Sequence, residues 1–127
     1  MNDLQIRLVH FASSIFKTLA PLKEDSLIEP AIKQIIRASS SVGANYSEAQ
    51  SASSYKDFHN KIRIALKELQ ETDFWIHFLA ETIPDISNLS ELEEETQELL
   101  RILSTISKKT DLKLKQRVPS EKGHLTD

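Results

Sequence analysis

The chain has 127 residues and a net charge of −3, with 39% apolar and 28% charged residues, as expected for one globular domain with a buried core. The absence of cysteine excludes a disulfide scaffold, a Cys-ligated zinc site and thiol catalysis. Two glycines and four prolines, beside plentiful Leu, Ile, Ala, Glu and Lys, favour helices over a turn-rich sheet. No apolar run reaches transmembrane length and no signal-peptide pattern is present, so we expect a cytoplasmic protein without a membrane partner.

Two helices are predicted in the first half of the chain. Apolar residues that recur every three or four positions predict a helix over residues 3–19, and Pro21 ends it. The second helix begins between Ser26 and Pro30: Ser26 and Glu29 have the capping-box spacing, whereas Pro30 as the first helical residue would move the cap to Glu29. The two apolar faces consist of Leu4, Leu8, Phe11, Ile15 and Leu19, and of Ile28, Ile32, Ile35, Val42, Tyr46 and Ala49.

Small side chains dominate residues 38–47 of the second predicted helix. One interpretation is a loop that binds phosphate, but such a loop needs several glycines at fixed offsets and this segment contains Gly43 alone. The other interpretation is a helix surface that a neighbouring helix approaches closely. The single glycine favours this second interpretation.

The third predicted helix, residues 54–83, is the longest of those in the bundle. Ser54 and Asp57 have capping spacing at its start, and Pro84 follows its end. Its seam alternates spacings of four and three, as in a coiled coil, through Phe58, Ile62, Ala65, Leu69, Thr72, Ile76, Leu79 and Ile83. A second apolar strip lies off this seam and, because one seam fills the bundle core, predicts an interface between copies of the chain; it contains Leu66, Phe74, Trp75 and Phe78.

The fourth predicted helix covers residues 88–109, and residues 110–127 read as a frayed extension followed by a disordered tail. Its seam contains Leu89, Leu92, Thr96, Leu99, Leu103 and Ile106. Four amphipathic helices with short turns predict an all-α, antiparallel up-down-up-down bundle over residues 1–109. The alternative, an open coiled-coil rod, is disfavoured by the explicit turns after Leu19 and Ile83.

Charge is sorted along the chain. Basic residues prevail in residues 54–67 and 99–127, whereas residues 68–98 contain acidic residues and no Lys or Arg. The helix dipole explains acids at the start of the fourth helix but not bases at the start of the third. An antiparallel bundle would gather these bases at one basic pole, which is a candidate contact for nucleic-acid phosphates or else a solvated charged face. The candidate residues are Lys56, Lys61, Arg63, Lys67, Lys108 and Lys109.

No convergent catalytic or metal-ligating pattern emerges from the predicted helices. They contain no Glu-x-x-His pair, as a di-iron bundle requires, and the chain has no His-Glu-x-x-His motif. Asp73, His77 and Glu81 share one helical stripe that offers metal ligands, but no partner ligands on another helix are visible, and a solvated polar stripe is the simpler interpretation. The serines at positions 39–41 lack an identifiable base. We therefore expect no enzyme activity, cofactor, metal or small-molecule substrate.

Two blocks of sequence resemble the signatures of the bacterial four-helix-bundle family known as the 23S rRNA intervening-sequence proteins. The first block is Arg37, Ala38, Ser41, Val42, Asn45, Glu48 and Ala49; the second is Phe58, Ala65, Glu68, Glu71 and Thr72. The resemblance implies a left-handed bundle that assembles into a pentameric ring, with no catalytic residues and no established role. It also implies distant similarity to the accessory protein of diversity-generating retroelements, a basic pentamer that binds nucleic acid, although the present chain is acidic overall.

The signature residues suggest contacts between helices or protomers. Glu68 and Glu71 are placed to serve Arg37 across a helix pair. The full set of candidate bundle or oligomer interface residues is Arg37, Asn45, Glu48, Glu68, Glu71, Trp75 and Phe78. Two functional hypotheses follow: an oligomeric scaffold or adaptor associated with ribosomal RNA or ribonucleoprotein, and a protein that binds RNA or DNA directly through the basic pole.

Overall fold

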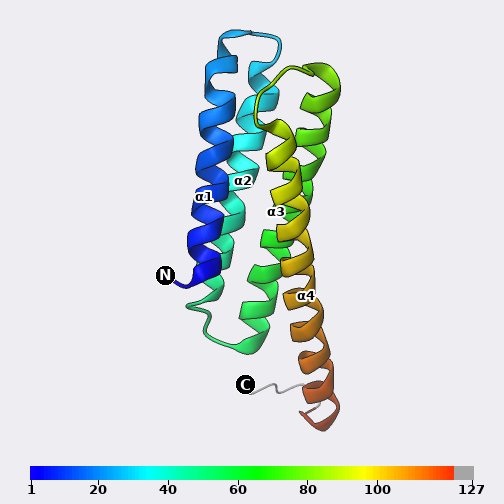
Figure 1. Cartoon of the computed structure of the whole chain (residues 1–127). Coiled ribbons are helices and arrows are strands. Elements are labelled where there is room, and N and C mark those ends of the chain that lie inside the picture. Colours follow the sequence, from blue (N-terminus) through cyan, green and yellow to red (C-terminus); the bar gives the residue numbers. More distant parts are fainter. Residues whose placement is uncertain (122–127) are drawn as a thin grey trace.

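The computed structural model describes residues 1–121 and, apart from Lys23, the side chains of residues 1–116. The described residues form no strand and four α-helices: α1 (Asp3–Leu19), α2 (Glu29–Ala49), α3 (Tyr55–Thr82) and α4 (Leu89–Glu121), with a 3-10 helix at Ala20–Glu24. The chain runs up and down the bundle (Figure 1). The predicted all-α four-helix bundle is therefore confirmed over this part of the chain. Within it, no helix is both long enough and apolar enough to cross a membrane.

Side-chain caps hold the first turns of α1 and α3. The Asn2 side chain accepts a hydrogen bond from the Gln5 amide (2.8 Å), and Gln5 Oε1 accepts one from the Asn2 amide (2.7 Å), which completes a capping box. At α3, Ser54 Oγ accepts a hydrogen bond from the Asp57 amide (3.0 Å), as the sequence predicted. These bonds satisfy amides that have no partner inside the helix.

The start of α2 differs from both predicted arrangements. α2 begins at Glu29 after Ile28, and no side chain caps it, so the predicted capping box of Ser26 with Glu29 is wrong and Glu29 is a helical residue rather than the cap. Asp25 organises this turn instead: its carboxylate accepts a hydrogen bond from the amide two residues ahead (2.9 Å) and its carbonyl one from the Glu29 amide (3.0 Å). Pro30 lies in the first turn, where its missing N–H removes no helical hydrogen bond.

The predicted seams form the hydrophobic core. Thr72 and Thr96, the polar members of the α3 and α4 seams, are fully buried. Their hydroxyls donate to the carbonyls of Glu68 (2.9 Å) and Leu92 (2.7 Å), one turn earlier, so neither is left unsatisfied. The buried apolar core includes Leu8, Phe11, Ile15, Leu19, Ile32, Ile35, Val42, Tyr46, Ile62, Leu69, Ile76, Leu79, Leu99 and Leu103.

Close approach of α1 explains the small residues of α2. Residues 38–47 lie inside α2, so the phosphate-loop interpretation is wrong. A Cβ atom added to Gly43 would lie 3.3 Å from the Leu8 Cβ of α1, which is tighter than ordinary van der Waals contact. Glycine at this position therefore permits the short distance between the two helices.

α4 extends beyond its predicted end near Lys109. It continues to Glu121 and projects past the loop that joins α2 to α3 (Figure 1). Thr110, where the sequence predicted the start of a frayed segment, is 5% exposed. It packs on α3, where its hydroxyl lies against His59 Nδ1. The predicted end of the fourth helix near Lys109 is thus wrong. Residues 122–127, the last part of the predicted tail, lie outside the described part of the chain.

The four contacts between neighbouring helices differ in extent. The contact between α2 and α3 is the most extensive, followed by α3 with α4 and by α1 with α2. The contact between α1 and α4 is the smallest of these. The bundle therefore has one side on which a groove can form.

Candidate functional site

The basic residues predicted to contact nucleic acid lie at one end of the bundle, on the first turns of α3 and a late part of α4 (Figure 1). Lys61 is engaged there: its Nζ lies 2.8 Å from Glu48 Oε1, and this hydrogen bond raises the pKa of Lys61. Arg63 lines two neighbouring hollows, one shared with Lys108 of α4 and one with Lys67 of α3. Within the described part of the chain, no ion pair is made by Lys56, Arg63, Lys67, Lys108 or Lys109.

The hollow between α3 and α4 has a buried histidine at its base. His59 is 7% exposed, and its Nδ1 contacts the Thr110 hydroxyl, which itself donates to the Ser107 carbonyl (3.0 Å). Whether His59 Nδ1 donates or accepts in its contact with Thr110 depends on the tautomer of the ring. His59 Nε2 lies 3.8 Å from Asp111 Oδ1. Burial lowers the pKa of His59; Asp111 opposes this effect and the charge of Arg63 adds to it.

His59 and Thr110 were not among the predicted site residues. Both are polar residues that face an apolar core, and a single polar residue on such a face is no specific signal. The spacing offers one clue: Thr110 continues the four-and-three seam of α4 from Leu103 and Ile106.

Arg37 of α2 pairs with Glu68 and Glu71 of α3, the partners that the sequence predicted. Its guanidinium lies 3.2 Å from Glu68 Oε1 and 2.7 Å from Glu71 Oε2. The hydrogen bond to Glu71 is the main cause that raises the pKa of Arg37. Glu71 Oε2 also accepts a hydrogen bond from Trp75 Nε1 at 3.4 Å. The structure thus joins four of the candidate interface residues in one cluster, and their role in assembly stays a prediction.

The remaining polar signature residues lie apart from this cluster. The Asn45 amide donates to the Ser41 carbonyl of its own helix (2.9 Å). Glu48 is exposed and pairs with Lys61. Neither residue contacts the Arg37 cluster, so the seven candidate interface residues do not form one continuous site.

An aromatic strip remains on the surface of α3 after the bundle has closed. Phe74 is 61% exposed and Phe78 is 40% exposed, while Trp75 between them is half-buried against the core. The rings make edge-to-face contacts, with centroids 5.2 Å apart for Phe74 and Trp75 and 5.4 Å for Trp75 and Phe78. The strip is therefore an ordered apolar surface rather than a set of scattered side chains.

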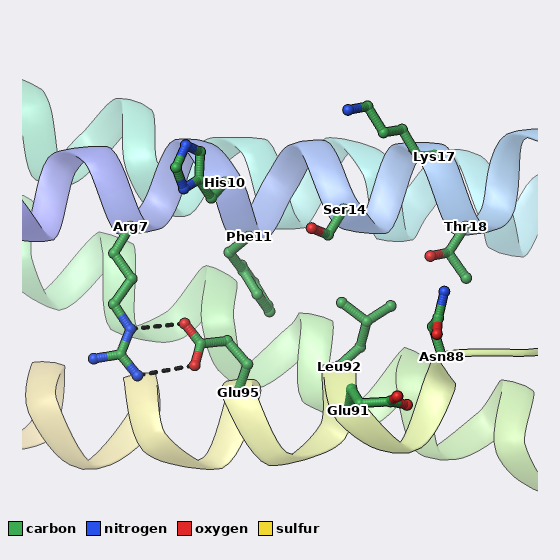
Figure 2. A pocket seen from close by; sticks show the side chains of 10 residues that line it. All are labelled: Arg7, His10, Phe11, Ser14, Lys17, Thr18, Asn88, Glu91, Leu92 and Glu95. Atoms are coloured by element: carbon green, nitrogen blue, oxygen red, sulfur yellow. Dashed lines mark hydrogen bonds and ion pairs between the residues drawn. The ribbon is translucent and has the colours of Figure 1, made fainter.

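A groove separates α1 from α4 (Figure 2). Phe11 and Leu92 form its apolar floor, and a bidentate ion pair spans one end, with Arg7 Nε 2.7 Å and Arg7 Nη2 2.8 Å from the two Glu95 oxygens. These hydrogen bonds are the main cause that raises the pKa of Arg7. The sequence did not predict this groove, because Arg7 and Glu95 are too far apart along the chain to be recognised as a pair.

The polar stripe of α3 forms an ion-pair network rather than a recognisable metal centre. His77 Nδ1 lies 2.8 Å from the Asp73 carbonyl, and His77 Nε2 lies 3.5 Å from Glu93 Oε2 of α4. The bond to the Asp73 carbonyl is the main cause that raises the pKa of His77. Glu81, the third residue of the predicted stripe, is exposed. Among the described residues, no group of three or more His, Asp or Glu side chains is placed to hold a metal ion.

These features define a small helical-bundle protein with charged and aromatic surfaces on its long third helix. Residues 5–105 match the family of 23S rRNA-intervening sequence proteins, and the chain belongs to this family. A crystal structure of a protein with unknown function from the S23 ribosomal protein family of Bacteroides thetaiotaomicron is similar, with 32% identity and a TM-score of 0.75. The similarity covers 82% of this chain and 97% of that chain. Among curated proteins, none matches this chain.

Proposed function

We propose that this protein is a non-enzymatic scaffold or adaptor whose antiparallel four-helix protomers assemble into a ring-shaped homo-oligomer, a pentamer, in the cytoplasm. The observation that carries the proposal is the exposed aromatic strip of Phe74, Trp75 and Phe78. The family's name supports an association with ribosomal RNA or ribonucleoprotein. The proposal includes no cofactor, metal or small-molecule substrate.

The surroundings of the strip support its role as an interface between copies. Each square ångström of apolar surface removed from water contributes roughly 25 cal/mol, and large aromatic rings dominate such contacts. The Arg37–Glu68–Glu71 cluster borders the strip through the Trp75 indole. An apolar centre with a polar border is the usual anatomy of a protein–protein interface.

The oligomer is tested by light scattering coupled to size-exclusion chromatography. We expect the wild-type chain to show a mass of five protomers of 14.5 kDa. The double variant Phe74→Glu with Phe78→Glu should elute as a monomer with unchanged helical circular dichroism. Leu27→Glu is the matched control, because Leu27 is 91% exposed and lies outside the strip. A monomeric wild type at about 10 μM, or a double variant with the wild-type mass, would refute the interface.

Direct binding of RNA or DNA through the basic pole is the second candidate function. The cations Lys56, Arg63 and Lys67 of α3, which form no ion pair with a described carboxylate, favour it. A gel-shift assay over a range of salt concentrations tests this function. Steep loss of binding with salt, together with loss of binding after charge reversal at the three residues, supports direct binding. Salt-independent recruitment to ribonucleoprotein supports the adaptor instead.

A further inference from the structure

We propose that the hollow between α3 and α4, lined by His59, Arg63, Ser107, Lys108 and Asp111, binds one phosphate group. This inference deepens the proposed association with RNA and rests on it for its biological meaning. The chemistry shared by a backbone phosphodiester and a free phosphate defines the site, and the experiments below distinguish these two sources.

Two cations converge on the hollow from different helices. Arg63 comes from the early part of α3 and Lys108 from the late part of α4, and neither makes an ion pair with a described carboxylate. A guanidinium and an ammonium supply directed donors for several phosphate oxygens, and the Ser107 hydroxyl adds a neutral donor. The lining therefore supplies several donors to one anion.

One oxygen of the single carboxylate in the lining pairs with a lysine outside the hollow, and the other faces His59. Asp111 Oδ2 lies 3.2 Å from Lys115 Nζ, and Asp111 Oδ1 faces His59 Nε2 at 3.8 Å. Its charge is thus shared with Lys115, which follows one turn later on α4. Arg63 and Lys108, the two cations of the hollow, have no such partner among the described side chains.

The buried ring of His59 responds to the charges around this hollow: burial is the main cause that lowers its pKa, and Asp111 raises that pKa more than Arg63 lowers it. A phosphate anion between Arg63 and Lys108 favours the protonated ring and so raises the pKa of His59. Binding at this site can therefore be separated from binding elsewhere on the basic pole.

The first experiment uses inorganic phosphate on the full chain. Each histidine is titrated by NMR of its ring carbon in chloride buffer and in phosphate buffer of equal ionic strength. We expect phosphate to raise the pKa of His59 by about half a unit or more, while the pKa of His77, which lies outside the hollow, stays unchanged. The double variant Arg63→Gln with Lys108→Gln should lose this shift. Lys17→Gln with Lys33→Gln, which removes two exposed lysines on α1 and α2, should keep it.

An equal shift in all the variants, or no shift at His59 in the wild type, would overturn the site. Helical circular dichroism of each variant confirms that it is folded. His59→Gln checks the assignment of the NMR signals. Removing this ring should abolish the signal assigned to His59 and leave the signals of the other histidines in place.

The second experiment replaces phosphate with a 20-nucleotide single-stranded RNA and measures fluorescence anisotropy. We expect Arg63→Gln with Lys108→Gln to weaken binding about tenfold, because both cationic contacts to one backbone phosphate are removed. The Lys17→Gln and Lys33→Gln control should change it less than about twofold.

The outcomes separate this site from the proposed function. RNA binding that is unaffected in Arg63→Gln with Lys108→Gln but lost in Lys56→Gln with Lys67→Gln would overturn the site and leave the association with RNA intact. Phosphate binding at His59 without RNA binding would support the site, assign it to a small phosphate-bearing ligand and remove the association with RNA.

Discussion

The contact between α2 and α3 and the contact between α1 and α4 close the same bundle by different means. α2 and α3 make the most extensive contact in the molecule, and the Arg37–Glu68–Glu71 cluster lies on its surface. α1 and α4 make the smallest contact, leave a groove and meet through the Arg7–Glu95 ion pair (Figure 2). Since apolar packing contributes far more than a partly exposed ion pair, we expect stability to reside mainly in the first contact.

The largest expected effect comes from truncating the core. Leu69 of α3 is fully buried, whereas Leu92 of α4 is 6% exposed and lines the groove. Leu69→Ala should lower the free energy of unfolding by about 3–5 kcal/mol, and Leu92→Ala by about 2 kcal/mol, because less neighbouring packing is lost at the groove. Urea denaturation at one fixed protein concentration measures both values. Equal losses at the two sites would contradict the difference between the contacts.

The next effect concerns the close approach of α1 and α2. Gly43→Leu adds a side chain where even a Cβ atom lies 3.3 Å from Leu8 Cβ. We expect a loss of about 2 kcal/mol in the free energy of unfolding from overpacking, despite the better helix propensity of leucine. Ala44→Leu is the control, because Ala44 is an exposed neighbour on the same helix. A Gly43→Leu variant as stable as the wild type would show that the two helices can separate without cost.

These two contacts also show how far the sequence predicts the structure. The four-and-three spacing of apolar residues predicted the helices and most of the core, because that spacing is a local consequence of helical geometry. The pairing of Arg37 with Glu68 and Glu71 could be anticipated because the helices that carry them are consecutive. The Arg7–Glu95 pair could not, since nothing in either residue's neighbourhood indicates the other.

The basic pole was predicted in part. Sorting of charge along the chain identified Arg63 and Lys108, and the up-and-down course of the helices brings them to one hollow. The buried base of that hollow was missed because His59 and Thr110 are polar residues on core faces. The end of α4 was misplaced for the same reason: Thr110 interrupts the apolar pattern although it continues the seam.

A smaller effect is expected from the ion pair between α1 and α4. Arg7→Met removes a bidentate contact whose side chains are 39% and 31% exposed. Because solvent screens such a pair, the free energy of unfolding should fall by about 0.5–1 kcal/mol. This loss should shrink in 1 M NaCl, where the charges are screened further. Arg101→Met is the control, since its contact with Glu98 lies within α4. A salt-independent loss at Arg7 would indicate packing rather than charge.

The smallest effects concern the two histidines on the α3–α4 contact, and their signs are opposite. The pKa of His59 in the folded protein is lowered below 6.5, chiefly by burial, so the unfolded chain binds more protons as the pH falls. Its contribution to stability is therefore present above pH 6.5 and is lost as the pH falls through the folded-state pKa. The pKa of His77 is raised, chiefly by the Asp73 carbonyl, so its contribution is present below pH 6.5 and is lost as the pH rises through its folded-state pKa.

The comparison of His59→Gln and His77→Gln with the wild type isolates these contributions. Between pH 8 and pH 5, the stability of the wild type relative to His59→Gln should decrease, by about 1 kcal/mol or less. Relative to His77→Gln, it should increase over the same range. Urea denaturation measures both differences. The buffers contain no phosphate, because an anion bound in the α3–α4 hollow would raise the pKa of His59. If both stability differences changed in the same direction between pH 8 and pH 5, burial would not control the protonation of His59.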